Sequence, residues 1–138
     1  MPKNYAVYLA GPMENVSQEQ MTSWRNQAKN TLSLRDIEVL DPVRRIHSGQ
    51  QRHMRRVFEL DLLDIRNSDF IIVNLNDDTV PKNGTSMEVF YASYVLRKPV
   101  IAFKKEKTQY HPFFESLVTE WCADVEEACS LIINEYLF

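Results

Sequence analysis

The strongest constraint on the fold is an alternation of short, strand-like apolar runs with segments of helical periodicity. The apolar runs cover residues 5–10, 37–40, 70–75 and 99–103, and a further short strand is expected around Trp121 and Cys122. Helices are expected over residues 17–34, 51–67, 84–97 and 125–137, with a weak helical turn over 113–118. Strands connected through helices form parallel sheets that are covered on both faces. The pattern therefore predicts an α/β fold built on a doubly wound parallel sheet of about five strands.

Composition limits the domain organisation and the function classes. The chain has 138 residues, so residues 1–138 are expected to form a single domain. A net charge of -3 disfavours nucleic acid polymers as partners. No apolar run approaches the roughly 20 residues that a bilayer requires, and residues 1–4 do not resemble a leader, so we expect no membrane contact and a cytoplasmic location. The histidines and cysteines lack metal-ligand spacing, so no metal site is expected and both thiols should be free.

The helix expected at residues 51–67 carries an acidic residue within its apolar stripe. The stripe consists of Met54, Val57, Phe58, Leu62 and Ile65. Asp61 lies in its middle, and a buried carboxylate is costly unless it is paired or hydrogen-bonded. Two interpretations remain open: a structural aspartate satisfied by backbone amides, or an acid whose raised pKa lets it share or donate a proton. Asp64, at the edge of the stripe, is expected to be solvated.

A second acidic residue of interest, Glu88, ends the segment Gly84-Thr85-Ser86-Met87-Glu88 at the start of a predicted helix. In the first helical turn, the helix dipole would keep this carboxylate ionised, and an ionised carboxylate can act as a nucleophile. The alternative is a capping box, in which Glu88 reaches back to the backbone N–H of Thr85. The residues alone leave both open.

Basic residues are concentrated after the second predicted strand. Five of the nine arginines lie between residues 44 and 58: Arg44, Arg45, Arg52, Arg55 and Arg56. Arginine clusters suit phosphate or carboxylate recognition, and Arg44 and Arg45 are best placed because they follow the strand directly. The alternative is a solvated helix face that pairs with Glu59 and Asp64.

Three further features concern the ends of the predicted strands and the subunit surface. Tyr8 is either a core residue or a hydroxyl at a site, and Gly11, Gly49 and Gly84 either punctuate turns or allow a ligand to approach.

The helix at 84–97 is apolar almost all round, and this predicts a homodimer or a higher homo-oligomer. The residues behind that prediction are Phe90, Tyr91, Tyr94, Val95 and Leu96, with Leu60 and Leu63 from the preceding helix.

Three segments together resemble the nucleoside 2-deoxyribosyltransferase family. They are Tyr8-Leu9-Ala10-Gly11-Pro12-Met13, the pair of Asp61 and Asp69 before an apolar strand, and Gly84 to Ala92 with Lys98-Pro99-Val100. The resemblance covers most of residues 5–103. It implies a flavodoxin-like or Rossmann-like sheet and no metal or organic cofactor. It also implies a nucleophilic glutamate at Glu88, an aspartate that contacts the deoxyribose and assists proton transfer at Asp61, and a tyrosine near the nucleophile at Tyr8.

The implied reaction cleaves the N-glycosidic bond of a 2′-deoxynucleoside through a glutamyl-deoxyribose intermediate and transfers the sugar to another nucleobase. Expected partners are therefore a nucleoside or nucleotide and a free nucleobase. The substrate-binding residues that we expect are Gly11, Pro12, Met13, Arg44, Arg45, Lys82, Gly84, Thr85, Ser86 and Met87.

Two alternatives to a transferase remain. The related deoxynucleoside 5′-monophosphate N-glycosidases are hydrolases, and a catalytically silent nucleotide-binding module could use the same pocket. Lys82 stands six positions before Glu88, where the transferases usually carry an acid, and it favours a 5′-phosphate. Against a phosphate, the loop Gly11-Pro12-Met13-Glu14 lacks the basic residue of the monophosphate hydrolases.

Overall fold

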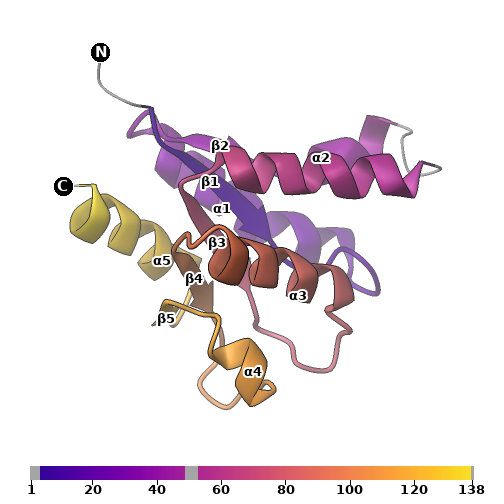
Figure 1. Ribbon diagram of the computed structural model, residues 1–138. Helices are drawn as coiled ribbons and strands as arrows, with labels where there is room; N and C mark the ends of the chain where they lie inside the picture. The colour runs from indigo at the N-terminus through magenta and orange to yellow at the C-terminus, as the bar shows by residue number, and fades with distance from the viewer. Residues whose placement is uncertain (1–3, 49–52, 138) are drawn as a thin grey trace.

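Five strands form one parallel sheet in the computed structural model, which describes residues 4–48 and 53–137. The sheet order is β2-β1-β3-β4-β5 (Figure 1). The strands are β1 (Ala6–Ala10), β2 (Glu38–Leu40), β3 (Phe70–Asn74), β4 (Val100–Phe103) and β5 (Glu120–Cys122). This order confirms the predicted α/β fold, and it is the order of flavodoxin-like sheets, in which the order of the strands, and not their direction, reverses between β1 and β3.

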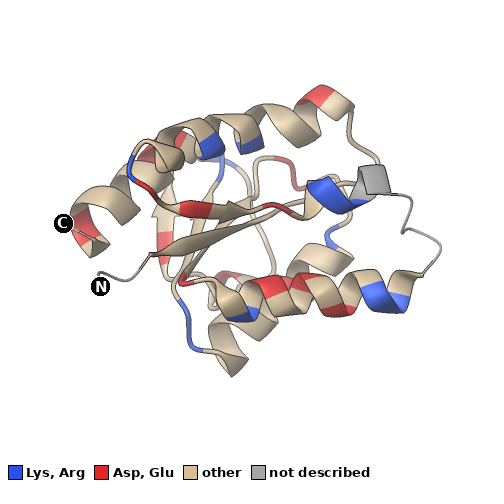
Figure 2. Ribbon diagram, turned by 90° about the horizontal axis from the view of Figure 1, so that it is seen from above, with Lys and Arg blue, Asp and Glu red and all other residues tan. Residues whose placement is uncertain are grey.

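Helices cover both faces of the sheet, so the molecule has three layers (Figure 2). One face carries α1 (Gln18–Ser33) and α5 (Val125–Leu131), which continues into the π-helical segment η4 (Ile132–Tyr136). The other carries α2 (Met54–Asn67) and α3 (Asn83–Phe90), which continues into the π-helical segment η3 (Tyr91–Val95). The 3-10 helix η1 (Pro42–Ser48) follows β2, and the short α4 (Pro112–Glu115) precedes β5. No helix within residues 4–48 or 53–137 is long and apolar enough to cross a membrane.

Successive residues of β1 alternate between two separate apolar clusters. Val7 and Leu9 pack with α1 and α5, whereas Tyr8 and Ala10 pack with α2 and α3. This alternation follows from the pleat of a strand, in which neighbouring side chains point to opposite faces. The Tyr8 side chain therefore lies on the face that α2 and α3 cover.

The helices begin and end close to the predicted positions, with one difference. Ser17 caps α1 in a capping box with Gln20, at the predicted start of this helix. The third and last predicted helices are each divided, with the α-helix giving way to a π-helical segment after Phe90 and after Leu131.

The apolar stripe of α2 is buried only in the second half of the helix. The buried residues of α2 are Asp61, Asp64 and Ile65, while Met54 is 62% exposed and Phe58 is 39% exposed. The expectation that Met54 and Phe58 belong to the core was wrong, because both lie in the first half of the helix. In the second half, two carboxylates are buried because they pair with arginines from η1.

Candidate active site

Tyr8 and Glu88 meet on the α2 and α3 side of the sheet. The Tyr8 hydroxyl, fully buried on β1, donates a hydrogen bond to Oε2 of Glu88 on α3, and Glu88 is itself buried. The capping-box interpretation of Glu88 was wrong, because α3 begins at Asn83 with Lys82 in the cap position and places Thr85 inside the helix. The expected first-turn position was wrong for the same reason, since no acidic residue lies in that turn.

The environment of Glu88 favours its protonated form. Burial raises the pKa of Glu88 from 4.5 to about 7, while the hydrogen bond from Tyr8 acts to lower it. The negative charge of Asp61 raises the same pKa, and the charges of Arg25 and Arg45 lower it. A carboxylate with these surroundings is partly ionised at neutral pH and poorly solvated when it is ionised.

Asp61 lies on α2 and pairs with an arginine rather than with backbone amides. Its Oδ1 accepts a hydrogen bond of 2.5 Å from Nη1 of Arg45, and both side chains are 11% exposed. Burial raises the pKa of Asp61, and the charge of Arg45 opposes that rise. The structural alternative that invoked backbone amides was therefore wrong about the partner, and the direction of the pKa fits an acid that can hold a proton.

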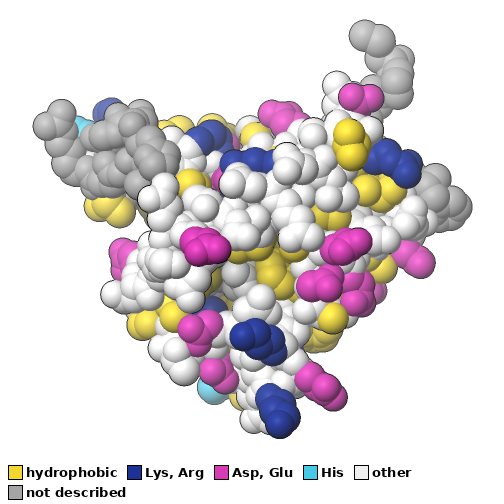
Figure 3. Space-filling view, turned by 180° about the vertical axis from the view of Figure 1, so that it is seen from behind, with side chains coloured by type: hydrophobic (Ala, Val, Ile, Leu, Met, Phe, Trp, Pro, Cys, Tyr) yellow, Lys and Arg dark blue, Asp and Glu magenta, His cyan; other side chains and the backbone are white. Residues whose placement is uncertain are grey.

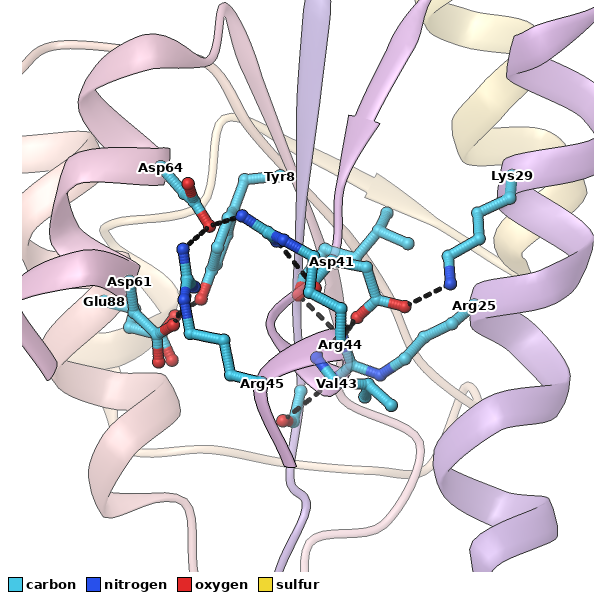
Figure 4. A network of polar contacts seen from close by, with 12 residues as sticks. Tyr8, Arg25, Lys29, Asp41, Val43, Arg44, Arg45, Asp61, Asp64 and Glu88 are labelled. Carbon is cyan, nitrogen blue, oxygen red and sulfur yellow. Dashed lines mark hydrogen bonds and ion pairs between the residues drawn. The ribbon is translucent and has the colours of Figure 1, made fainter. Parts of the chain in front are cut away.

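The arginines that follow β2 are turned toward buried carboxylates. Asp64 is buried and accepts hydrogen bonds from Nη2 of Arg44 at 2.7 Å and lies 2.8 Å from Nη2 of Arg45 (Figure 4). Arg44 also donates to the backbone oxygen of Asp41 at 2.7 Å. The expectation of a solvated Asp64 was wrong, because α2 presents this residue to η1 and not to water.

Another arginine of the cluster, Arg55, has a partner other than Asp61 and Asp64. Arg55 pairs with Glu59 on the exposed side of α2, as the alternative interpretation expected. Arg52 and Gly49 lie outside the residues that the structure describes.

Arg25 is a residue that the sequence pattern did not single out, and it is among the largest fully buried side chains of the described residues. Nη1 of Arg25 donates to the Leu9 carbonyl at 2.8 Å and to Oδ1 of Asp41 at 2.9 Å, and Nη2 donates to the Gly11 carbonyl at 3.1 Å. Burial lowers the pKa of Arg25, and Asp41 opposes this. A signal was present, because Arg25 lies within the apolar stripe of α1 just as Asp61 lies within that of α2. The α1 stripe consists of Met21, Trp24, Ala28 and Leu32.

The loop after β1 is not brought against Glu88 as a whole. A Cβ at Gly11 would lie 2.9 Å from Cζ2 of Trp24, so the glycine is required by close packing against α1. Pro12 lines a cleft of about 610 Å³ with Trp24 and Asn74, on the α1 and α5 side of the sheet. Figure 3 looks onto this side and shows a hollow with apolar side chains on its floor. Met13, next in the chain, is half-buried.

The residues before Glu88 are placed in different environments. Lys82 donates from Nζ to the carbonyls of Asp77 and Val80 and lies 5.2 Å from the ring centre of Tyr110, so its charge is engaged within the loop before α3. Among the next predicted residues, Thr85 is buried, Ser86 is half-buried, and Gly84 and Met87 are exposed. Thr85 is therefore the one that shares the buried side of α3 with Glu88.

Comparison with known proteins identifies a family and similar solved structures for this chain. A family model described as nucleoside 2-deoxyribosyltransferase matches residues 7–131. The chain is similar to a 2-deoxyribosyltransferase from the bacterium Bacillus psychrosaccharolyticus, with 23% identity, a TM-score of 0.71 and 88% of each chain covered. It is also similar to a 2-deoxyribosyltransferase from Leishmania mexicana, with 24% identity, a TM-score of 0.59, and 81% of this chain and 70% of that chain covered. These identities establish a shared fold, and no curated protein sequence matches.

Proposed function

The chain belongs to the nucleoside 2-deoxyribosyltransferase family, and we propose that it cleaves the N-glycosidic bond of a 2′-deoxynucleoside and transfers the deoxyribosyl group to another nucleobase. The observation that carries the proposal is the buried hydrogen bond from the Tyr8 hydroxyl to the Glu88 carboxylate, with Asp61 beside it (Figure 4). A nucleophile that is held by one donor in a buried environment combines positioning with weak solvation.

In the first step, an oxygen of ionised Glu88 attacks C1′ of the deoxyribose. The bond between C1′ and the base nitrogen breaks, and its electron pair leaves with the base. The sugar then remains as a glycosyl ester on Glu88. The transition state has oxocarbenium character, so the negative charge of Glu88 stabilises it as well as capturing the sugar.

Asp61 supplies the proton that the departing base requires. Its carboxyl group has a raised pKa caused by burial, which favours a protonated form that can donate. In the second step, a nitrogen of the acceptor base attacks C1′ and the ester bond breaks. Glu88 leaves as a carboxylate, and the proton lost by the acceptor returns to Asp61.

The charges around the site favour a free nucleoside over a 5′-monophosphate. Arg44 and Arg45 are paired with buried aspartates, and Lys82 is held by backbone carbonyls. A phosphate would have to displace these partners before it could gain charge-assisted hydrogen bonds. This arrangement supports a substrate whose deoxyribose has no 5′-phosphate, and it disfavours the monophosphate hydrolase.

The proposal is tested by incubating the protein with one deoxynucleoside and a different free base, and separately with the matching monophosphate, followed by chromatography of the products. We expect the new deoxynucleoside to form in the first mixture and the Glu88→Gln variant to form none. Release of base and sugar phosphate only from the monophosphate would instead indicate the hydrolase. Binding without turnover of any of these compounds would indicate the silent module.

A further inference from the structure

We propose that Arg25 and Asp41 are positioning residues for this site: the Arg25 guanidinium takes the place of a missing part of β2 along the end of β1 and holds Tyr8 against Glu88. The inference rests on the proposed role of Glu88. It adds a residue pair from the opposite face of the sheet that the chemistry itself does not touch.

The hydrogen-bond ladder between β1 and β2 stops short of the end of β1. The N–H of Glu38 donates to the Tyr5 carbonyl at 2.9 Å, and the pairing register ends at Tyr8 and Leu40. In a parallel ladder, every second residue of one strand donates to every second carbonyl of its neighbour. The residue that would donate to the Leu9 carbonyl is therefore residue 42, and Pro42 has no N–H. Pro42 therefore ends the ladder before the Leu9 carbonyl, which receives no hydrogen bond from β2.

Arg25 supplies the donors that β2 does not. Its Nη1 reaches the Leu9 carbonyl and its Nη2 reaches the Gly11 carbonyl, which are two residues apart and so lie on the same edge of β1. A guanidinium presents N–H groups in a planar fork, so a single side chain can serve both carbonyls. The strand end that follows Tyr8 is thereby fixed without a neighbouring strand.

Asp41 connects this fork to the other half of the site. Its Oδ1 accepts from Arg25 and from the N–H of Val43 at 3.0 Å, and its Oδ2 lies 2.7 Å from Nζ of Lys29. Val43 lies in the first turn of η1, the element that carries Arg45 to Asp61. Figure 4 shows the two sets of side chains on either side of β1, joined through η1. One buried ion pair therefore fixes both Tyr8 and Arg45.

The charge of Arg25 also reaches Glu88. The charged or titratable groups that act on Glu88 are Tyr8 from β1, Asp61 from α2, Arg45 from η1 and Arg25 from α1. The negative charge of Asp61 raises the pKa of Glu88, and the Tyr8 hydrogen bond and the charges of the two arginines lower it. Removal of the Arg25 charge should therefore raise the pKa of Glu88, and removal of the Asp41 charge should have the opposite effect.

The test measures the titration of the Glu88 carboxyl by NMR of protein labelled with carbon-13 in glutamate side chains, with the Glu88 signal assigned by its absence in Glu88→Gln. In Arg25→Met we expect the proton dissociation constant of Glu88 to fall roughly tenfold. In Asp41→Asn it should rise. Arg25→Lys should raise the Glu88 midpoint by less than Arg25→Met does and should lower kcat, since lysine keeps the charge and lacks the fork that holds Tyr8. The matched control, Arg35→Met, replaces an exposed arginine at the end of α1 and should change neither.

Opposite shifts in Arg25→Met and Asp41→Asn are not expected of residues that only support the fold. If Arg25→Met does not fold, the lysine and asparagine variants carry the test. A wild-type Glu88 midpoint together with a wild-type kcat in the folded variants would overturn the proposal. Because the titration needs no substrate, an absence of turnover in the wild-type protein would count against the proposed function and not against the roles of Arg25 and Asp41.

Discussion

On the α1 side of the sheet, the Arg25 guanidinium donates to three oxygens within the described chain, whereas on the α2 and α3 side the Glu88 carboxylate accepts from one described hydroxyl, that of Tyr8. Both groups are buried. The first has three oxygen partners, one of them the carboxylate of Asp41, although its Nε has no hydrogen-bond partner within the described chain. The second has one neutral donor, and its pKa is raised to about 7. A buried charge that is paired with an opposite charge acts as a structural element, and a buried charge with a single neutral partner is left available for reaction.

Replacement of Glu88 by Gln should have the largest effect on activity. The variant removes the nucleophile and keeps the size and a hydrogen-bond acceptor for Tyr8, so we expect kcat to fall by at least about a thousandfold while the fold is retained. Steady-state kinetics measures the loss. The matched control is Glu106→Gln, which replaces an exposed acid in the turn after β4. Retained turnover would return Glu88 to a structural role.

The Glu88→Gln substitution should also change how the free energy of unfolding depends on pH. Because the folded-state pKa of Glu88 is raised from 4.5 to about 7, its contribution is present below pH 4.5 and is lost as the pH rises through about 7. That shift corresponds to about 3 kcal/mol in favour of the variant above pH 7. Denaturant unfolding of both proteins at pH 4 and pH 8 measures it. A stability difference between the two proteins that is the same at pH 4 and pH 8 would mean that Glu88 is not buried as described.

Asp61→Asn is the next largest change. The loss of the proton donor should lower kcat by roughly a hundredfold or more and remove the decline of activity at high pH. The rise of activity with pH should be retained, because it reports the ionisation of Glu88 and protonated Asp61 carries no charge over that range. A pH profile of kcat/KM tests both limbs. An unchanged profile would assign Asp61 to pairing with Arg45 alone.

Tyr8→Phe should have a smaller effect. The hydroxyl lowers the pKa of Glu88 by donating to it, so without this group the activity should rise only at higher pH. Loss of a hydrogen bond to a charged group costs about 1.5–3 kcal/mol, or roughly tenfold to a hundredfold in kcat at neutral pH. A normal kcat with a normal pH profile would show that Tyr8 is a packing residue.

The two faces also differ in exposed apolar surface, and the smallest predicted effect on the chemistry concerns this difference. Exposed apolar residues gather on α2, α3 and η3: Met54, Phe58, Leu63, Met87, Phe90, Tyr94 and Val95. We expect at least a dimer through this side. Sedimentation should show more than the mass of 16.2 kDa, and Phe90→Asp should reduce the assembly. A monomer at micromolar concentration would exclude it.

The elements of the fold could be predicted from the sequence because the apolar runs of the strands are short, continuous and bounded by turn residues. The extent of burial along α2 could not, because an apolar stripe indicates which side of a helix avoids water and not how much of its length is covered. The burial of Asp64 could not be predicted either, because its partners Arg44 and Arg45 come from a segment outside the helix.

For the site, the residue types were predictable and their contacts were not. Tyr8 and Glu88 are 80 positions apart, and only the sheet brings them together. The local alternative for Glu88, a capping box, depends on where α3 begins, and helix boundaries are the least reliable feature of a sequence pattern. Arg25 could have been found by the test that singled out Asp61, namely a charged residue within an apolar helix stripe.

The central claim, that Glu88 is the nucleophile, is tested most directly by mass spectrometry of the protein after acid quenching of a reaction with a deoxynucleoside and no acceptor base. The account predicts a deoxyribosyl adduct on the peptide that contains Glu88, absent in Glu88→Gln and lost when a second base is added before the quench. Turnover of the same deoxynucleoside with no adduct, or an adduct on another residue, would contradict it.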